Sequence, residues 1–326
     1  MNHADPNRNA ELARNVAVAL RFKKSQGTPE MSQVEKEVLA PNYDRVRGGN
    51  YHLASNARDQ DFPHPGMYLR TAIPDRVDII EEVIAEGDRV GLLFRVTGTH
   101  TGNFLGIPPT GKKIDVYEVA LLRIVNGQMV EGWFMMDETA LLQQLGAKIP
   151  PRKDGRIIAP PLPNTGDDAD AYAQRLASQP TASERDRRIF IVARSRGSTR
   201  SKADQAADHR LQRFGFLHMR AYCQAHGLRD LGLDTAIPDR RDRIDVLMAE
   251  GDQVWMRFST SGTHKESLCG LPPTGKRVGV PAVALMKFDD GQWKESWTFA
   301  DEMGMLLQLG APNLLLDRTA EVRADG

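Results

Sequence analysis

The chain has 326 residues, of which 40% are hydrophobic and 26% are charged, a composition typical of soluble globular proteins. Its 43 basic and 43 acidic residues cancel, which argues against nucleic acid or an anionic membrane as a partner. The length favours two domains over one, because single hydrophobic cores rarely grow beyond ~300 residues.

Two helices are predicted at the start of the chain, over residues 9–25 and 28–39. Four strands follow, over residues 76–86, 89–100, 114–125 and 128–137, with turn signals at 87–88 and 126–127. The loop between the second and third strands contains Pro-Pro and three glycines, which do not fit inside a strand. Residues 138–145 are a short helix that ends at Gly146. Helices followed by an antiparallel meander predict an α+β domain over residues 8–147.

Residues 148–202 have the composition of a linker, because they are rich in proline, glycine and charge. We expect at most a short helix over 167–177 and a short strand over 188–194. The basic residues there can contact an anionic partner, but a solvated linker is the preferred interpretation. A helix over about 203–226 then opens a second domain, residues 203–316.

The sheet of the first domain occurs twice in the chain. Residues 73–147 align without a gap with residues 237–311, at a constant offset of 164 positions, and roughly half the positions are identical. The identical stretches include IPDR, AEGD, GTH, PPTGK and QLGA. This repeat indicates a tandem duplication.

Several of these motifs carry a family resemblance. The strings GTHTGNFLGIPPTGKK, RIVNGQMVEGW and DETALLQQLGA, with IPD and AEGD, resemble the SnoaL-like polyketide cyclases, or ester cyclases, of the nuclear transport factor 2-like superfamily. The resemblance covers about residues 11–147 and 237–311. It implies two cones, each a curved antiparallel sheet wrapped on helices around an apolar cavity for a small ligand.

The resemblance also implies a type of chemistry and an assembly. Family members work without a cofactor, typically in the intramolecular aldol closure of a polyketide ester, and commonly dimerise through their sheets. The two copies are therefore expected to dock as an internal pseudo-dimer, with a homo-oligomer as a further possibility. We expect no nucleic-acid partner and no membrane partner.

Aldol closure needs a carboxylate that takes a proton and a donor that holds the enolate oxygen. The resemblance implies an Asp after the conserved Trp and a His on the preceding strand. Those two positions fall on Phe134 and Ala120 in the first copy, and on Thr298 and Ala284 in the second. Both copies therefore depart from the family's pair.

Glu118 is the candidate acid–base group of the first copy. A three-residue hairpin loop at 125–127 would pair Glu118 with Phe134 and place the even-numbered residues on the cavity face. Among Leu122, Phe134 and Met136, the pKa of Glu118 is expected to be raised, which suits acid–base work near neutral pH. The alternative is a carboxylate at the cavity mouth, solvated or paired with a lysine. The second copy has hydroxyls but no acid on this face, and is predicted to be the weaker site.

Histidines supply the other candidates. His100 ends the GTH strand and either donates to a ligand carbonyl or bonds the loop backbone. His64 lies in a loop at the expected cavity rim. His218 and Tyr222 are one helical turn apart and either face the second cavity or form a half-buried pair. With these, the predicted cavity lining is Ala120, Leu122, Phe134, Met136, His64, His218, Tyr222 and Thr298.

The histidines are scattered without HExxH, so no metal site is expected. The polar N-terminus, the lack of a long apolar run and the absence of CxxC spacing predict a cytoplasmic protein.

The sequence thus predicts a cofactor-independent cyclase, isomerase or lyase that acts on a small apolar carbonyl compound. Glu118 would be its acid–base group, and His100 or a histidine at the cavity rim its oxygen-binding donor. The alternatives are a non-catalytic small-molecule-binding or scaffolding protein that keeps the cavity, and hydrolysis of a small ester or lactone.

Overall fold

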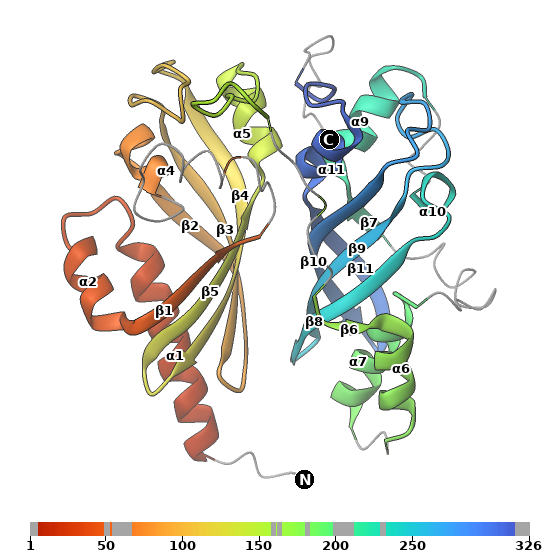
Figure 1. Cartoon of the computed structure of the whole chain (residues 1–326). Coiled ribbons are helices and arrows are strands. Elements are labelled where there is room, and N and C mark those ends of the chain that lie inside the picture. The colour runs from red at the N-terminus through yellow and green to blue at the C-terminus, as the bar shows by residue number, and fades with distance from the viewer. Residues whose placement is uncertain are drawn as a thin grey trace. The chain divides into compact units, whose positions relative to one another are not determined.

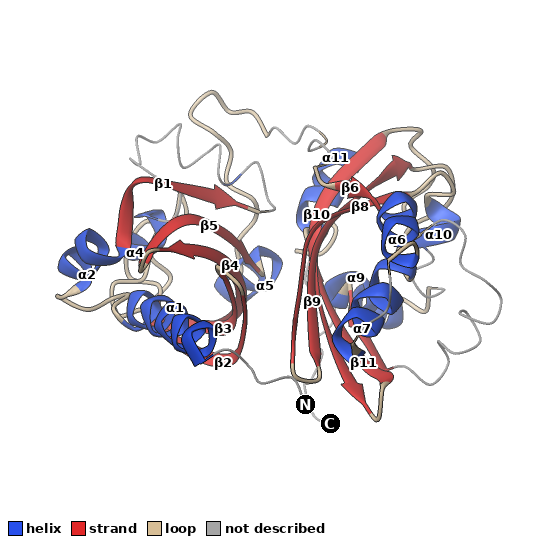
Figure 2. Cartoon of the chain, turned by 90° about the horizontal axis from the view of Figure 1, so that it is seen from below, coloured by secondary structure: helices blue, strands red, loops and turns tan. Residues whose placement is uncertain are grey.

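The chain forms two compact units, Met1–Ile157 and Ile158–Gly326. The structure is a computed structural model, and it describes residues 6–48, 53, 67–157, 161, 165–179, 183–197, 212–228 and 233–316. Each unit combines a curved sheet with helices, as Figures 1 and 2 show. The predicted α+β class and the duplication are confirmed.

The first unit is a five-stranded sheet in the order β1-β5-β4-β3-β2. β1 pairs in parallel with β5, and the other pairs are antiparallel. Figure 2 shows this sheet curving around α1. The elements are α1 (Pro6–Lys24), α2 (Met31–Val38), β1 (Leu39–Arg47), α4 (Met67–Ala72), β2 (Val77–Glu86), β3 (Arg89–Thr99), β4 (Lys113–Val125), β5 (Gln128–Met136) and α5 (Glu138–Leu145).

The second unit repeats this topology in a six-stranded sheet, ordered β6-β8-β9-β10-β11-β7. β7 pairs in parallel with β11, as β1 does with β5. The elements are β6 (Asp167–Asp168), α6 (Ala169–Ala177), α7 (Glu184–Arg194), β7 (Gln212–Gly215), α9 (Leu217–Ala225), α10 (Leu233–Ala236), β8 (Arg241–Glu250), β9 (Gln253–Thr263), β10 (Arg277–Asp289), β11 (Gln292–Ala300) and α11 (Glu302–Leu309).

The segment predicted as a linker, residues 148–202, contributes to the core of the second unit. Ala173 on α6 and Val192 on α7 are buried against Met256 and Phe258 on β9. The strand predicted over 188–194 is instead the end of α7, because its buried residues recur at helical spacing and Ser183 caps the helix start. The second domain therefore begins before residue 203.

The helix predicted over 203–226 also differs from the structure, in the part that is described. Residues 212–215 are the strand β7, and α9 begins only at Leu217. Pairing with β11 draws this segment into the sheet, with Phe214 opposite Trp297. Tertiary pairing here overrides the local helical pattern.

The hairpin between β4 and β5 sets which side chains meet on the sheet. Asn126 and Gly127 have φ values of 52° and 76°, so the turn has two residues and Val125 pairs with Gln128. A bulge after Arg123 then pairs Glu118 with Met136. The predicted pairing with Phe134 was wrong by two residues, but a shift of two keeps every side chain on its predicted face.

The short helices α5 and α11 end each repeat in the same way. The Asp137 carboxylate accepts the backbone N–H of Ala140, and Asp301 accepts that of Gly304, both at 2.8 Å. Gly146 and Gly310 end the helices with φ values of 66° and 90°, in the left-handed region that glycine tolerates. The predicted helix stop at Gly146 is confirmed.

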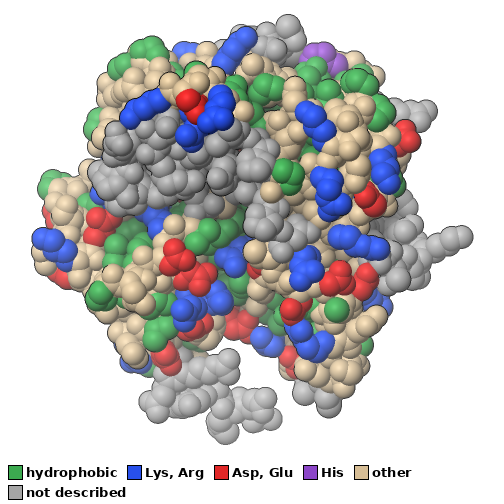
Figure 3. Space-filling model, in the orientation of Figure 1, with side chains coloured by type: hydrophobic (Ala, Val, Ile, Leu, Met, Phe, Trp, Pro, Cys, Tyr) green, Lys and Arg blue, Asp and Glu red, His purple; other side chains and the backbone are tan. Residues whose placement is uncertain are grey.

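The surface charge is mixed, in keeping with the zero net charge of the chain. Figure 3 shows Lys and Arg side chains interspersed with Asp and Glu side chains on one face. None of the helices in the described ranges combines the length and hydropathy needed to cross a bilayer.

Candidate functional site

The first unit contains four buried charged side chains in one network: Lys23, Arg76, Asp78 and Glu118. Their side chains are between 0% and 5% exposed. Lys23 lies near the end of α1, Arg76 precedes β2, and the two carboxylates stand on β2 and β4. Three elements far apart in the sequence thus bring two cations and two anions together.

Asp78 is the centre of this network. Its carboxylate accepts two hydrogen bonds from Arg76, at 2.7 and 3.1 Å, and lies 2.8 Å from the Lys23 ammonium nitrogen. Burial alone would raise the pKa of Asp78. The positive charges of Arg76 and Lys23 and their hydrogen bonds outweigh burial, and hold the pKa below its usual value.

Lys23 is the most strongly perturbed cation of the site. Burial lowers its pKa to about 8, with a further lowering by the neighbouring Arg76 charge, while Asp78 and Glu118 act in the opposite sense. Its ammonium also lies 3.7 Å from the centre of the Phe94 ring, a favourable cation–π position. A lysine with a pKa near neutrality on the inside of a cone is a common sign of a functional site.

Glu118 does not have the purely apolar surroundings predicted for it. It is 2% exposed, and its carboxylate accepts a hydrogen bond from Arg76 at 3.3 Å and lies 4.0 Å from Lys23. The alternative of pairing with a lysine is therefore nearer to the structure, although the site is buried. The raised pKa was predicted from apolar neighbours alone, whereas two cations lie beside this carboxylate.

The structure does not bring His100 and Glu118 together. Phe94 pairs with Glu118 across β3 and β4, and His100 follows Phe94 by six residues, or about 20 Å of strand. Nδ1 of His100 accepts the backbone N–H of Thr110 at 3.2 Å and lies 3.0 Å from its hydroxyl. Burial lowers the pKa of His100. His100 thus anchors the loop, and it is not an oxygen-binding donor beside Glu118.

His264 does the same in the second unit, with Nδ1 3.1 Å from the Thr274 hydroxyl. The shared GTH and PPTGK motifs therefore form a loop clamp in each unit.

Four predicted lining residues share one buried face of the first sheet with Glu118: Ala120, Leu122, Phe134 and Met136. Ala120 pairs directly with Phe134, so the two positions of the family's dyad do face each other across the strands. In the second unit Thr298 is half-buried and pairs with Ala284. His64 lies outside the described residues.

The predicted inward stripe of the second unit's helix was one residue out of register. The buried residues of α9 are Met219 and Cys223, whereas His218 and Tyr222 are half-buried. The buried Glu302 fixes the start of α9, because its carboxylate accepts the backbone N–H of Met219 at 2.7 Å. Tyr222 stacks on His226 with ring centres 4.1 Å apart.

Met219 and Cys223 pack α9 against the loop after β9. The Cys223 and Cys269 sulfurs are 2.7 Å apart, and both residues are buried and not joined by a disulfide. No sequence pattern indicates this contact, because the two residues are 46 positions apart.

The second unit repeats part of the charged network. Arg240 and Asp242 stand 164 positions after Arg76 and Asp78. The place of Lys23 is taken by Arg196, whose guanidinium lies 4.1 Å from the centre of the Phe258 ring and 3.9 Å from the Asp242 carboxylate. Sequence reasoning missed both networks, although the repeated IPDR motif contains one arginine of each.

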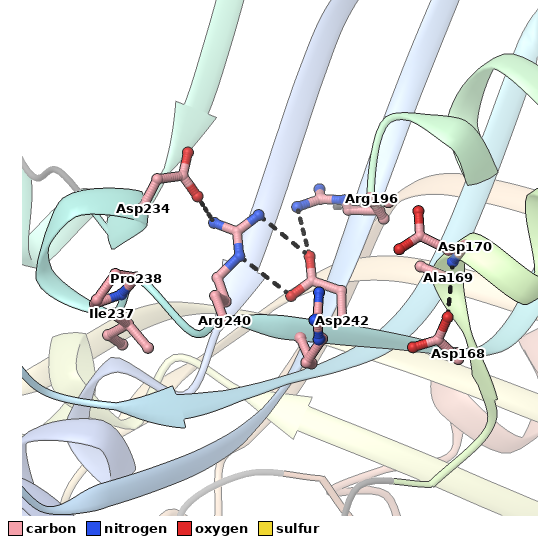
Figure 4. Close-up of a pocket in the computed structure, with 11 residues that line it drawn as sticks. Asp168, Ala169, Asp170, Arg196, Asp234, Ile237, Pro238, Arg240 and Asp242 are labelled. Atoms are coloured by element: carbon pink, nitrogen blue, oxygen red, sulfur yellow. Dashed lines mark hydrogen bonds and ion pairs between the residues drawn. The ribbon is translucent and has the colours of Figure 1, made fainter. Parts of the chain in front are cut away.

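A pocket of about 260 Å³ opens beside this second network, shown in Figure 4. Its walls combine acidic, basic and apolar side chains. They are Asp168, Ala169, Asp170, Arg196, Gly197, Asp234, Ile237, Pro238, Arg240, Arg241 and Asp242.

The profile of one protein family, the SnoaL-like polyketide cyclases, matches residues 67–145 and again residues 232–309. Each unit is a SnoaL-like domain. The two matches cover equivalent elements, from the helix before the sheet to the end of the last helix. The resemblance inferred from the motifs is confirmed.

Several solved structures are similar to parts of this tandem SnoaL-like protein. A Jannaschia sp. CCS1 protein assigned as a SnoaL-like polyketide cyclase is 25% identical, covers 46% of this chain and 100% of its own, and has a TM-score of 0.37. AclR from Streptomyces galilaeus, assigned as a hydroxylase, is 28% identical over 41% of this chain and 82% of its own, at a TM-score of 0.35. IdmH from Streptomyces antibioticus, assigned as a polyketide cyclase, is 21% identical, covers 41% of this chain and 99% of its own, and has a TM-score of 0.34. No functionally curated protein matches the chain.

Proposed function

We propose that the first SnoaL-like domain is a cofactor-independent acid–base catalyst, of the cyclase, isomerase or lyase type, that acts on a small apolar carbonyl compound. One observation carries this proposal. The Glu118 carboxylate and the cations of Arg76 and Lys23 share a single buried network on the inner face of the sheet. A base and two donors for a developing oxyanion are thus close together.

The proposed reaction begins with proton abstraction from the carbon next to a carbonyl group. Glu118 takes the proton, and the electron pair of the broken C–H bond moves onto the carbonyl oxygen to give an enolate. Lys23 and Arg76 hold that oxygen with charge-assisted hydrogen bonds. The enolate then attacks a second carbonyl carbon, is reprotonated elsewhere, or expels a leaving group, which gives the three reaction types.

Asp78 is a positioning residue in this scheme. It holds Arg76 through two hydrogen bonds, and the shorter of them, at 2.7 Å, is well below the 3.3 Å between Arg76 and Glu118. A substrate oxygen can therefore enter between Arg76 and Glu118 more readily than it can separate Arg76 from Asp78.

Proton exchange tests the proposal without knowledge of the natural substrate. The purified full chain is incubated in D2O with cyclohexanone or 1-indanone, and loss of the α-proton signal is followed by NMR. We expect exchange above the buffer rate, and a loss of at least about 100-fold of that excess in Glu118→Gln, the usual size of a general-base contribution. Glu131→Gln, at a half-exposed glutamate on β5 next to Arg123, is the control and should exchange like the wild type. Equal exchange by Glu118→Gln and wild type would remove Glu118 from the mechanism.

A second candidate is a non-catalytic protein that binds a small molecule. It is favoured by the two dyad positions of the first domain, where the buried side chains of Ala120 and Phe134 carry no acid or base. Native mass spectrometry of the purified protein would then find a bound compound that stays unchanged for hours, and neither ketone would exchange above the buffer rate.

Three expectations stay predictions: the internal pseudo-dimer, action without a cofactor, and a cytoplasmic location. The same native mass spectra bear on the second. A protein mass without an added cofactor supports it, and a tightly bound cofactor contradicts it.

A further inference from the structure

A tyrosine on β1 has a buried hydroxyl group that the packing of the first SnoaL-like domain does not explain. The phenol oxygen of Tyr43 is buried and makes no hydrogen bond with any residue that the structure describes. Buried polar groups are nearly always hydrogen-bonded, because a group that loses water without gaining a partner destabilises the fold. This hydroxyl therefore points to a hydrogen-bond acceptor that the described residues do not supply.

Tyr43 lies on the inner face of the sheet, which also carries Glu118. Arg45, two residues after Tyr43, pairs with Gly132, and Gly132 pairs with Leu122 on β4. Paired residues share a face, and so do residues two apart along one strand. Tyr43 is thus on the same face as Leu122 and, further along β4, Glu118.

The ring of Phe134 borders both the Tyr43 hydroxyl and the charged network. A Cβ atom on Gly132 would lie 2.1 Å from the Tyr43 oxygen and 2.7 Å from Cε2 of Phe134, so the hydroxyl and the edge of this ring are neighbours. The centre of the same ring lies 5.5 Å from the Lys23 ammonium nitrogen. A small substrate that lies along this ring can therefore contact both Lys23 and Tyr43.

The position of the hydroxyl depends on a glycine that the second domain does not have. Any side chain at residue 132 would displace the Tyr43 oxygen. In the second domain Ser296, 164 positions later, is in this place and is buried. Ser296 pairs with Arg213 as Gly132 pairs with Arg45, and the residue two positions before Arg213 is a leucine. The second domain thus has neither the glycine nor the tyrosine.

The second domain also lacks the carboxylate of the proposed base. Residue 282, at the place of Glu118, is alanine. Glu118, Tyr43 and Gly132 therefore occur together in one domain and are absent together from the other. Both domains form the same curved sheet with a parallel strand at its edge, so the fold does not require these three residues. Their joint occurrence indicates a shared purpose that is specific to the first domain.

We propose that Tyr43 is a substrate-binding residue of the first domain, whose hydroxyl donates a hydrogen bond to a second oxygen of the substrate. The first oxygen is that of the carbonyl group next to which Glu118 takes the proton. This inference rests on the proposed function and adds to it a residue that determines specificity. The substrate class narrows from a ketone to a ketone with a second oxygen acceptor.

The Tyr43 hydroxyl is suited to donate a hydrogen bond and not to act as a second base. Burial raises its pKa to about 12, and the nearby carboxylates of Glu35 and Asp44 act in the same direction, while the charge of Arg45 opposes them. The phenol therefore keeps its proton at neutral and moderately alkaline pH. Its part in the reaction is to position the substrate.

Two ketones that differ only in a second carbonyl group test this role: 2-heptanone and 2,6-heptanedione. Exchange of their α-protons by the full chain in D2O is followed by NMR, per α-proton and relative to the buffer rate. We expect kcat/KM to be about tenfold higher for the dione, the effect of a hydrogen bond to a buried donor that otherwise has no partner. Tyr43→Phe should abolish this preference and leave the exchange of 2-heptanone unchanged.

A matched substitution and a stability measurement are the controls. Tyr117→Phe removes the hydroxyl of a half-buried tyrosine on the other face of the sheet, where it contacts Glu81, and should keep the preference for the dione. Because the Tyr43 hydroxyl has no partner in the described part of the chain, Tyr43→Phe should have an unchanged or higher midpoint of thermal unfolding.

The possible results separate this inference from the proposed function. Exchange of 2-heptanone without a preference for the dione, or with a preference that Tyr43→Phe keeps, overturns the role of Tyr43 alone. A lower unfolding midpoint of Tyr43→Phe, with both ketones slowed equally, makes Tyr43 a structural residue and overturns that role too. Exchange of neither ketone by the wild type contradicts the proposed function, and this inference with it.

Discussion

Lys23 shows how much a single side chain depends on its partners. An ammonium group with 2% exposure loses most of its hydration, which costs several kcal/mol unless opposite charges surround it. Asp78, Glu118 and the Phe94 ring supply that compensation. Removal of any one member leaves a buried charge without its counter-charge, so the members of the cluster stabilise one another only when all are present. A set of this kind is costly for stability and is more easily explained by a use in binding or catalysis.

The pH dependence of proton exchange follows from Lys23. Burial lowers its pKa to about 8, so the side chain is protonated below that pH and neutral above it. If the ammonium holds the enolate oxygen, the excess rate should be level up to about pH 8 and then fall about tenfold per pH unit. Lys23→Arg keeps its charge and should stay level to about pH 10, once the buffer rate is subtracted. A wild-type rate that rises through pH 8 would instead make Lys23 the base.

The free energy of unfolding should depend on the same group, and should rise with pH over the range in which the exchange rate falls. The folded pKa of Lys23 lies below the 10.5 of an unfolded lysine. Between about pH 8 and that value the unfolded chain binds the additional proton, so the contribution of Lys23 to the free energy of unfolding rises with pH.

At the scale of elements, local patterns predicted the strands and missed what depends on pairing. The alternation of apolar and polar residues predicted the bounds of β2 to β5 nearly residue by residue, and Asn126-Gly127 predicted the position of the hairpin turn. The bulge after Arg123 has no sequence signature; together with a turn of two residues in place of the predicted three, it moved the partner of Glu118 by two residues. The predicted buried face of α9 was wrong by one residue, because the carboxylate that fixes the start of this helix comes from α11. Long-range contacts of this kind are invisible to periodicity.

The contact between α9 and the loop after β9 leads to a prediction about thiol chemistry. Because the sulfurs of Cys223 and Cys269 are adjacent, diamide should oxidise them to one intramolecular disulfide, with both electrons and both protons passing to the reagent. Closing this 46-residue separation should stabilise the fold by up to about 4 kcal/mol in the chain-entropy account. Mass spectrometry would show a loss of two hydrogens, and denaturation the higher stability. Cys223→Ser should show neither; disulfide-linked dimers in the wild type would contradict the prediction.

At the scale of the whole molecule, the sequence repeat is shorter than the structural one. Identity is confined to residues 237–311, yet each unit has helices before its sheet and a parallel strand from its N-terminal half. The spacing of Ile189, Val192 and Ala193 could have revealed α7. The role of Arg196 could not have been predicted, because it depends on where the chain places that side chain relative to Phe258.

Fragments of the chain test this domain boundary. Residues 158–326 contain α6 and α7 and should unfold cooperatively on heating, as followed by circular dichroism. Residues 203–326 lack the buried Ala173, Ile189 and Val192, and should be unfolded or aggregated, because the inner face of the sheet loses its cover. Equal cooperativity of the two fragments would show that α6 and α7 are dispensable.

The exchange of Lys23 for Arg196 has a consequence for how the two copies diverged. The cation that sits over the aromatic ring comes from α1 in one copy and from the turn after α7 in the other, 173 positions later, although the repeat offset is 164. The two copies therefore place a cation over the corresponding ring from different parts of their sequences. An alignment of the two copies, column by column, would record the cation at the Lys23 position as lost from the second copy. An ancestral sequence reconstructed from such an alignment would lack a charge that both copies have.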